Sequence, residues 1–416
     1  MLSETLNKRL TEVGPGTPMG GLLRCYWQPV AGVDELRTRR TKKIRVLGED
    51  LVLFRSAGGT YGLIGERCMH RGCSLEYGIP DPRGLRCPYH GWLYGETGEC
   101  LDQPAEADHA SFRARVRITA YPVQELGGML FAYMGEQPAP VLPPFDVYVW
   151  PDSIRQIGYT KLPVNWLQPM ENSLDPHHLE WLHGHFGDYV FAQQGQKPSA
   201  GIARKTLKIG FDQFEWGIIK RRVVEGTTED DEAWKVGHPI VFPNTLRVGR
   251  NGIYGFQVRV PIDDTNTMIW WYTTFRPRGV EVPPQETIPV FEIPYADENG
   301  EFILDTIEGQ DMMAWVTQGK VADRTTEHLG ASDRGVVMFR QLLQAEMAKH
   351  EEGKDPMGVI REAPSDGLIL LPQEEELYYR TADSLREELE RGPGMRYSPI
   401  TEQIIDLFAQ NPTENA

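Results

Sequence analysis

Short stretches in which polar and apolar residues alternate fill the early part of the chain. A period of two that is broken by glycines is typical of antiparallel strands joined by tight turns. The stretches are Lys43–Leu47 and Asp50–Arg55, joined by Gly48-Glu49 and followed by Gly58-Gly59. A linker containing Pro138, Pro140, Pro143 and Pro144 comes next. The pattern therefore predicts a small β domain that ends near Gly135.

Beyond the linker, longer stretches rich in β-branched and aromatic residues predict further antiparallel strands. They are Leu207–Phe211, Gly217–Val224, Ile253–Val260 and Thr267–Phe275. A helix is predicted after the cap Ser332-Asp333, with one apolar face formed by Val336, Phe339, Leu343 and Met347. The predicted fold class is α+β, with a helical arm at residues 1–25, an all-β domain at 26–140 and a larger sheet-and-helix domain at 141–416.

Composition narrows the function classes only slightly. The 416 residues carry a net charge of −16 and no basic stripe, which argues against a nucleic-acid partner. We find no signal peptide and no apolar run long enough for a membrane span, so we expect a cytoplasmic protein. Five cysteines are an odd number, and those outside the motif described next are expected to be reduced thiols.

Two short motifs supply two thiolates and two imidazoles: Cys68-x-His70 and Cys87-x-x-His90. This is the ligand set of a Rieske [2Fe–2S] cluster, which relays electrons. The glycines that close both loops, Gly72 and Gly91, can adopt positive φ beside a metal. A structural zinc site uses the same residue types but favours other spacings. The motifs therefore predict a cluster.

A second group, at Asp175, His178 and His183, offers two imidazoles for a mononuclear iron. Two histidines and a distant carboxylate form the facial triad of non-haem Fe(II) oxygenases. The histidines are five residues apart, about 140° around an ideal helix. Both can face one metal only if the helix widens or ends, and Gly184 is a plausible end.

Both groups, in this order, resemble the terminal oxygenase subunits of Rieske non-haem iron oxygenases. Further stretches resemble the phthalate dioxygenase-like branch, and within it the dehydrodivanillate-type aromatic O-demethylases and the phenoxybenzoate dioxygenases. They are Val13–Gly20, Tyr26-Trp27, Asn165–Gln168, Glu171–Ser173 and Glu180–Gly184. The resemblance implies a catalytic domain of helix-grip, START-like fold, in which a curved antiparallel sheet grips helices. It also implies the lower-potential cluster without a disulfide, because Cys73 has no partner where Tyr89 stands.

The resemblance further implies a role for each motif residue. Cys68 and Cys87 bind one cluster iron, and His70 and His90 bind the other. His178 and His183 bind the mononuclear Fe(II). Its third ligand is expected to be Asp311, with Asp305 and Glu308 as alternatives.

Asp175 matches the family's bridging acid, which connects a ligand histidine with His90 of a neighbouring subunit. A homotrimer or a stacked hexamer follows from that bridge. The chain contains no nucleotide-binding glycine motif and no plant-type ferredoxin motif. Electrons from NAD(P)H must therefore arrive through a separate reductase, with or without a ferredoxin. Arg67, Arg71, Arg83 and Arg86 near the cluster loops are candidates for docking it, or for local hydrogen bonds.

The expected reaction uses O2 to oxidise an aromatic carboxylate, with O-demethylation of a methoxylated lignin-type aromatic favoured. Ring dihydroxylation and diaryl ether cleavage are the alternatives within the family, and a non-catalytic Rieske electron carrier is the alternative outside it. Candidate cations for a substrate carboxylate are Arg204, Lys205, Arg221, Arg222, Arg247 and Arg259.

Overall fold

The computed structural model describes the chain apart from residues 107–108, 196–201, 251, 375–385, 387–392 and 411–416. Two short helices, α1 (Glu4–Thr11) and α2 (Pro18–Arg24), form the N-terminal arm. Serine and threonine side chains cap both helices, since Ser3 accepts from the Leu6 N–H and Thr17 from the Gly20 N–H. The arm packs on the late helix α10 (Arg334–Glu351).

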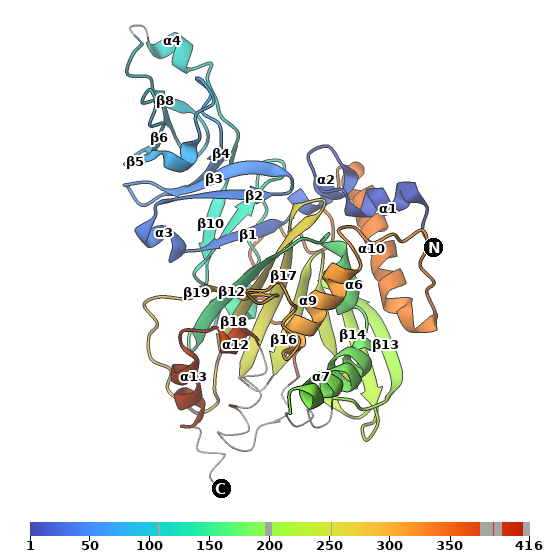
Figure 1. Cartoon of the computed structure of the whole chain (residues 1–416). Helices are drawn as coiled ribbons and strands as arrows, with labels where there is room; N and C mark the ends of the chain where they lie inside the picture. The colour runs from blue at the N-terminus through green and yellow to red at the C-terminus, as the bar shows by residue number, and fades with distance from the viewer. Residues whose placement is uncertain (107–108, 196–201, 251, 375–385, 387–392, 411–416) are drawn as a thin grey trace.

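Three small sheets follow the arm, and all their strands pair antiparallel. The first contains β1 (Trp27–Gly32), β11 (Met129–Tyr133) and β10 (Val123–Leu126). The second contains β2 (Thr41–Val46), β3 (Glu49–Arg55), β4 (Tyr61–Gly65) and β9 (Ala120–Tyr121). The third contains β5 (Ile79–Asp81), β6 (Gly84–Arg86), β7 (Leu93–Tyr94) and β8 (Cys100–Asp102). The short helices here are α3 (Glu35–Thr38), η1 (Leu75–Tyr77) and α4 (His109–Arg113). The third sheet projects from the molecule (Figure 1).

A large curved sheet of eight strands organises the rest of the chain (Figure 1). In spatial order it contains β13 (Thr206–Phe214), β14 (Gly217–Val224), β15 (His238–Val241), β16 (Thr245–Arg250), β17 (Ile253–Asp263), β18 (Asn266–Phe275), β12 (Ile154–Leu162) and β19 (Val290–Glu292). Seven of these strands pair antiparallel, and only β19 pairs parallel, with β12. The predicted antiparallel sheet is therefore confirmed, with a parallel strand at one edge.

Helices accompany this sheet. They are α5 (Asp146–Val149), α6 (Leu167–Ser173), the π-helix η2 (Leu179–Phe186), α7 (Gly187–Gln193), α8 (Glu232–Lys235), α9 (Ile307–Thr317), η3 (Ala331–Asp333), α10, α12 (Pro393–Arg396) and α13 (Thr401–Phe408). The predicted helix corresponds to α10, and its four predicted core residues are all buried. No helix of the described residues is both long and apolar enough to cross a membrane.

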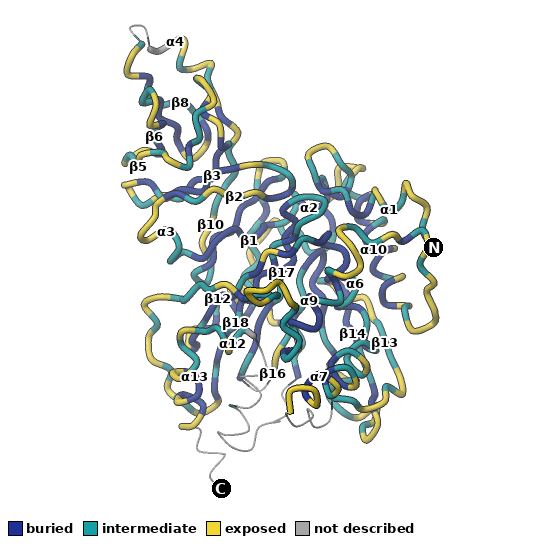
Figure 2. The backbone as a smooth tube through the Cα atoms, in the orientation of Figure 1, coloured by how far each residue is buried: buried dark blue, intermediate teal, exposed yellow. Residues whose placement is uncertain are grey.

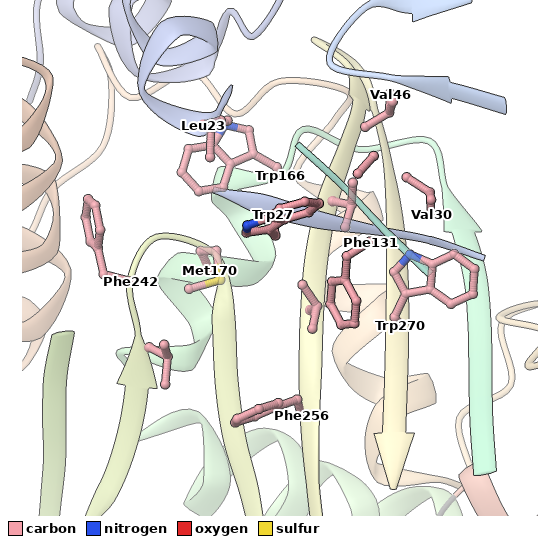
Figure 3. Close-up of a cluster of buried hydrophobic side chains, with 14 of the residues drawn as sticks. Leu23, Trp27, Val30, Val46, Phe131, Trp166, Met170, Phe242, Phe256 and Trp270 are labelled. Atoms are coloured by element: carbon pink, nitrogen blue, oxygen red, sulfur yellow. The ribbon is translucent and has the colours of Figure 1, made fainter. Parts of the chain in front are cut away.

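The middle strands of the large sheet are buried on both faces, as Figure 2 shows. On one face, Phe256 and Trp270 join a core with Trp27 and Phe131 of the first small sheet (Figure 3). On the other face, Trp271 of β18 packs with Met312 and Trp315 of α9. A strand buried on both faces reads as a continuous apolar run. The large sheet therefore lies between two layers. One is an apolar layer shared with the first small sheet, and the other is a layer of helices that includes α9.

A buried ion-pair network fixes α6 beneath the C-terminal helices. Arg324 donates to both carboxylate oxygens of Glu171 at 2.7–3.1 Å, and Arg340 donates to the same carboxylate at 2.6 Å. Arg340 also pairs with Glu327. Charged groups this deeply buried are tolerated because each carries several charge-assisted hydrogen bonds. The network sets where α6, and the segment that follows it, can lie.

One core cluster runs from the N-terminal arm through the first small sheet into the large sheet. The predicted boundaries after residues 25 and 140 therefore remain a proposal about domain organisation.

Candidate metal centres

Two loops of matching backbone geometry present the predicted cluster ligands. In the first, the Gly72 N–H donates to the Cys68 carbonyl and the Cys68 N–H to the Cys73 carbonyl. In the second, the Gly91 N–H donates to the Cys87 carbonyl and the Cys87 N–H to the Trp92 carbonyl. Gly72 and Gly91 have φ of 73° and 76°, which L side chains rarely adopt. The predicted need for glycine in both loops is confirmed.

The thiols and imidazoles of these loops lie close together. Cys68 and Cys87 are buried, and the rings of His70 and His90 have centroids 4.5 Å apart. His70 also stacks on Trp92 with a centroid distance of 4.6 Å. The Tyr94 hydroxyl accepts from the Met69 N–H and lies 3.3 Å from Cys68 Sγ, so its own proton is free to point at that sulfur.

The donor set of these loops fits a two-iron cluster better than a single ion. His70 Nδ1 is buried without a hydrogen-bond partner. Such burial costs free energy unless a metal binds the nitrogen. A tetrahedral zinc ion brings four ligand atoms close together, because each bond is only about 2.0–2.3 Å long. Among the described residues, the only side chains that place three or more such atoms within 4.8 Å of one another are His178, His183 and Asp311.

Those three side chains are the candidates for the second centre. His183 Nε2 lies 3.3 Å from Asp311 Oδ1, and His178 Nε2 lies 3.8 Å from the same oxygen. The two imidazole rings are 5.1 Å apart and nearly perpendicular. The pKa of His178 is lowered to about 4 by burial, against the opposing charge of Asp311. A buried neutral imidazole and a carboxylate are the forms that bind a divalent metal.

The π-helix η2 explains how histidines five residues apart face one point. A π-helix has a wider turn than an α-helix, and such turns often occur at functional sites. His178 is the residue just before η2, and His183 lies inside it. The predicted widening is confirmed, whereas the predicted end at Gly184 is wrong, because η2 continues into α7. Gly184 is required for another reason: a Cβ there would lie 2.5 Å from the Ala203 backbone.

Gln310 orients the second histidine. Its side-chain oxygen lies 2.9 Å from His183 Nδ1, while its amide nitrogen donates to the Leu304 carbonyl at 2.9 Å. The amide therefore accepts from an Nδ1–H, which leaves Nε2 of His183 free toward Asp311. Asn172 contributes on the other side by donating to Asp311 Oδ1 at 3.3 Å. Neither role was predicted from the sequence, where Asn172 appeared only within a stretch that resembles the family.

The remaining predicted site residues lie in different surroundings. Asp175 is one third exposed; its Oδ1 accepts from the His177 N–H and its Oδ2 lies 3.8 Å from His178 Nδ1. Asp305 is bound by Arg396 at 2.9 Å and does not join the histidines. Burial raises the pKa of Glu308 to about 7, and Glu308 lies outside the triad of convergent ligand atoms. The structure thus brings Asp311 to the histidines, and the ligand roles stay predictions.

Four of the six candidate cations, Arg221, Arg222, Arg247 and Arg259, lie on strands of the large sheet, over both of its faces, whereas Arg204 and Lys205 precede β13. Arg221 pairs with Asp212, and Arg247 pairs with Asp146 on the apolar-layer side. Arg259 is buried with 1% of its surface exposed. A further buried cation, Lys220, is 6% exposed and was not predicted from the sequence. A single sequence does not show whether a lysine in a predicted strand is buried or whether it has a partner.

Two family models match the chain. Residues 26–121 match the Rieske [2Fe-2S] domain, and residues 295–372 match a LigXa C-terminal domain like family. The first match contains the four predicted cluster ligands, and the second contains Asp311.

Curated relatives extend over most of the chain. The oxygenase subunit of 5,5'-dehydrodivanillate O-demethylase from Sphingobium sp. strain SYK-6 is 42% identical over 377 residues, covering 89% of this chain and 87% of that protein. Phenoxybenzoate dioxygenase subunit alpha from Ectopseudomonas oleovorans is 33% identical, covering 90% and 92%. Among solved structures, NdmA from Pseudomonas putida CBB5 has a TM-score of 0.60 at 20% identity, covering 84% and 99%. The last likeness shows the fold.

The identity of the third ligand can be tested by counting iron. We expect Asp311→Ala to lower the iron content from about three to about two atoms per chain, because only the mononuclear centre loses a ligand. The reduced cluster should keep its electron paramagnetic resonance signal. Asp305→Asn and Glu308→Gln serve as matched controls and should keep the full iron content. If a control variant loses iron while Asp311→Ala keeps its full iron content, the third ligand is the residue replaced in that control and not Asp311.

The orienting role of Gln310 predicts a defect in iron affinity. Gln310→Leu removes the acceptor for His183 Nδ1, so Fe(II) binding to the mononuclear centre should weaken roughly 10- to 100-fold. Gln310→Glu keeps an acceptor and should recover part of the affinity. Gln318→Leu, at the exposed end of the same helix, is the control and should bind Fe(II) as the wild type does. Equal affinities in all these variants would show that Gln310 does not orient the ligand.

Proposed function

The chain belongs to the Rieske non-haem iron oxygenases, and we propose that it O-demethylates a methoxylated aromatic acid. As an oxygenase of this family it uses a [2Fe–2S] cluster and a mononuclear iron, which together supply the electrons and the activated oxygen. In the proposed reaction, one oxygen atom is inserted into a methyl C–H bond. The resulting hemiacetal breaks into a phenol and formaldehyde, and two electrons and two protons convert the other oxygen atom to water.

One observation supports this reaction more than the alternatives. The relative that is 42% identical over 89% of the chain is named as an O-demethylase oxygenase subunit. The convergence of His178, His183 and Asp311 supports an oxygenase over an electron carrier, which needs only the cluster. His183 and Asp311 would hold the iron together with His178, while Gln310 keeps Nε2 of His183 turned toward it.

Apolar packing near the triad supports a site that excludes water. Met312 follows Asp311 directly on α9 and is fully buried against Trp271 of the sheet. On the same helix, Trp315 is 1% exposed. Protection from water keeps the activated oxygen for the substrate and strengthens charge interactions within the site. These side chains seal α9 against the sheet on one side of the centre.

The positions of the two centres support electron transfer between subunits. Figure 1 shows the cluster region, sheet β5–β8, at one end of the molecule and α7 near the other end, with α9 in the middle. Exposed apolar side chains occur at both ends: Met69 and Tyr89 on the cluster loops, and Trp181 and Tyr189 on η2 and α7. Two different apolar surfaces on one chain suit a head-to-tail ring. We therefore propose a homotrimer or a stacked hexamer in which Asp175 mediates the contact.

We propose that a ferredoxin or a reductase delivers the electrons from NAD(P)H in the cytoplasm. One related structure is described as an oxygenase and ferredoxin complex of carbazole 1,9a-dioxygenase. Arg67, Arg71 and Arg83 are exposed near the cluster loops and can meet an acidic partner. Arg67 and Arg83 lie 3.6 Å from the carboxylates of Glu66 and Asp81. Arg86 binds two carboxylates more closely, Asp81 at 3.0 Å and Asp102 at 2.8 Å, which gives it a local structural role.

Diaryl ether cleavage through ring dihydroxylation is the second candidate. It is supported by the 33% identity to a phenoxybenzoate dioxygenase subunit over 90% of the chain. The two reactions differ in which substrate carbon lies over the iron, so their products distinguish them.

Product analysis tests the proposed reaction. The holoenzyme, supplied with NADH and a phthalate dioxygenase-type reductase, should release formaldehyde from methoxybenzoates, at about one molecule for each O2 consumed. Asp311→Ala should abolish it because the iron ligand is lost. Release of phenol or diols from phenoxybenzoates, without formaldehyde from any methoxy compound, would favour the second candidate and refute demethylation.

Mixed oligomers test transfer between subunits. His90→Ala should inactivate the cluster, and His178→Ala should inactivate the mononuclear centre, so each variant alone is expected to be inactive. Oligomers co-expressed from both variants, purified with two different tags, should recover activity, because a working cluster then faces a working iron of its neighbour. Inactive mixed oligomers that retain both intact centres would place electron transfer within one chain.

A further inference from the structure

Two buried cations of the large sheet lie on the face that meets the helices. The register of the paired strands shows that both residues lie on this face. Gln257 pairs with Leu246, and Ile240 pairs with both Leu246 and Ile218. Directly paired residues share a face, and so do residues two apart on a strand. Lys220, two residues after Ile218, therefore shares a face with Arg259, two residues after Gln257.

This shared face is the one that α9 covers. Arg259 pairs directly with Ile269 of β18. Ile269 packs in one core cluster with Met312 and Trp315 of α9. The charges of Asp175 and Asp311 also act on Lys220, and that of Asp311 acts on Arg259. Both cations are thus in the electrostatic field of the mononuclear centre.

Neither cation has a carboxylate partner among the described residues. Arg259 donates to the carbonyl and the side-chain oxygen of Gln257, at 2.7 and 2.8 Å, and its Nε has no partner. The side-chain nitrogen of Lys220 makes no hydrogen bond or ion pair in the part of the chain that the structure describes. Burial, with repulsion from Arg222, lowers the pKa of Lys220 to about 8, and burial lowers that of Arg259 to about 9.

An uncompensated buried cation is costly unless something anionic binds beside it. The two acids whose charges act on Lys220 do not pair with it, because Asp311 faces the two histidines and Asp175 faces His178. His238, opposite Lys220 on the neighbouring strand, is itself paired with Glu374. A bound metal would add positive charge to the site and increase its affinity for an anion.

We propose that Lys220 and Arg259 bind the carboxylate of the aromatic acid, and so determine which part of the ring system faces the mononuclear centre. This inference rests on the proposed function, because it assigns the residues that recognise the substrate of that same site. Arginine offers a planar fork for a carboxylate and lysine offers a single strong charge, so together they can contact both oxygens.

Binding of benzoate and of the neutral benzamide to the anaerobic holoenzyme, measured by calorimetry, tests the proposal without requiring turnover. The wild type should bind benzoate more tightly. Lys220→Met should weaken benzoate binding roughly 10- to 100-fold and leave benzamide binding unchanged. Lys220→Arg should retain the preference. Lys208→Met, which removes an exposed lysine of the adjacent strand β13, is the control and should behave as the wild type.

Thermal unfolding, measured first without ligand and then with benzoate, gives a second, independent measurement. Lys220→Met removes an unpaired buried charge and keeps the length of the side chain, so its midpoint should rise above that of the wild type. Benzoate should raise the midpoint of the wild type but not that of Lys220→Met. Equal binding of benzoate and benzamide by the wild type would overturn the proposal. A clear preference for benzoate in an enzyme that releases no formaldehyde would refute demethylation and leave the carboxylate site standing.

Discussion

The contact between Asp311 and the two histidines determines how the helices beside the large sheet are arranged. A carboxylate that is only 8% exposed must be paired, and its partners come from a segment more than a hundred residues earlier. Bringing those segments together requires α9 to lie on the sheet and η2 to lie beside it. The Glu171 network holds α6, and the chain from α6 to η2 is then short enough to fix His178.

At both candidate centres, a few hydrogen bonds hold the ligand side chains in place. Gln310 uses one amide group to hold His183 and the backbone before α9. In the cluster loops, one pattern of two backbone hydrogen bonds and one glycine of positive φ is used twice. Both centres are therefore fixed by backbone and neutral side-chain hydrogen bonds, which leaves the imidazole and thiolate groups free for metal.

Much of the fold was predictable because its signals are local. Alternation gave β2 and β3, the apolar face of α10 gave its four core residues, and the Cys and His spacing gave the cluster loops. Spacing alone did not distinguish Asp305, Glu308 and Asp311, because all three occupy one short segment. The family resemblance favoured Asp311, and the structure brings that residue to the histidines. The end predicted at Gly184 was wrong since glycine there relieves crowding against Ala203 rather than ending a helix. Lys220 was missed because the face of a strand residue follows from register, which sequence does not reveal.

One chain carries both an electron relay and a mononuclear iron. Mössbauer spectroscopy of the ⁵⁷Fe-enriched, reduced holoenzyme can test this, because the technique resolves each kind of iron. About two thirds of the iron should appear as a reduced Rieske cluster, and about one third as a high-spin ferrous site. A spectrum in which all the iron belongs to the cluster, even after incubation with Fe(II), would contradict the claim and leave an electron carrier.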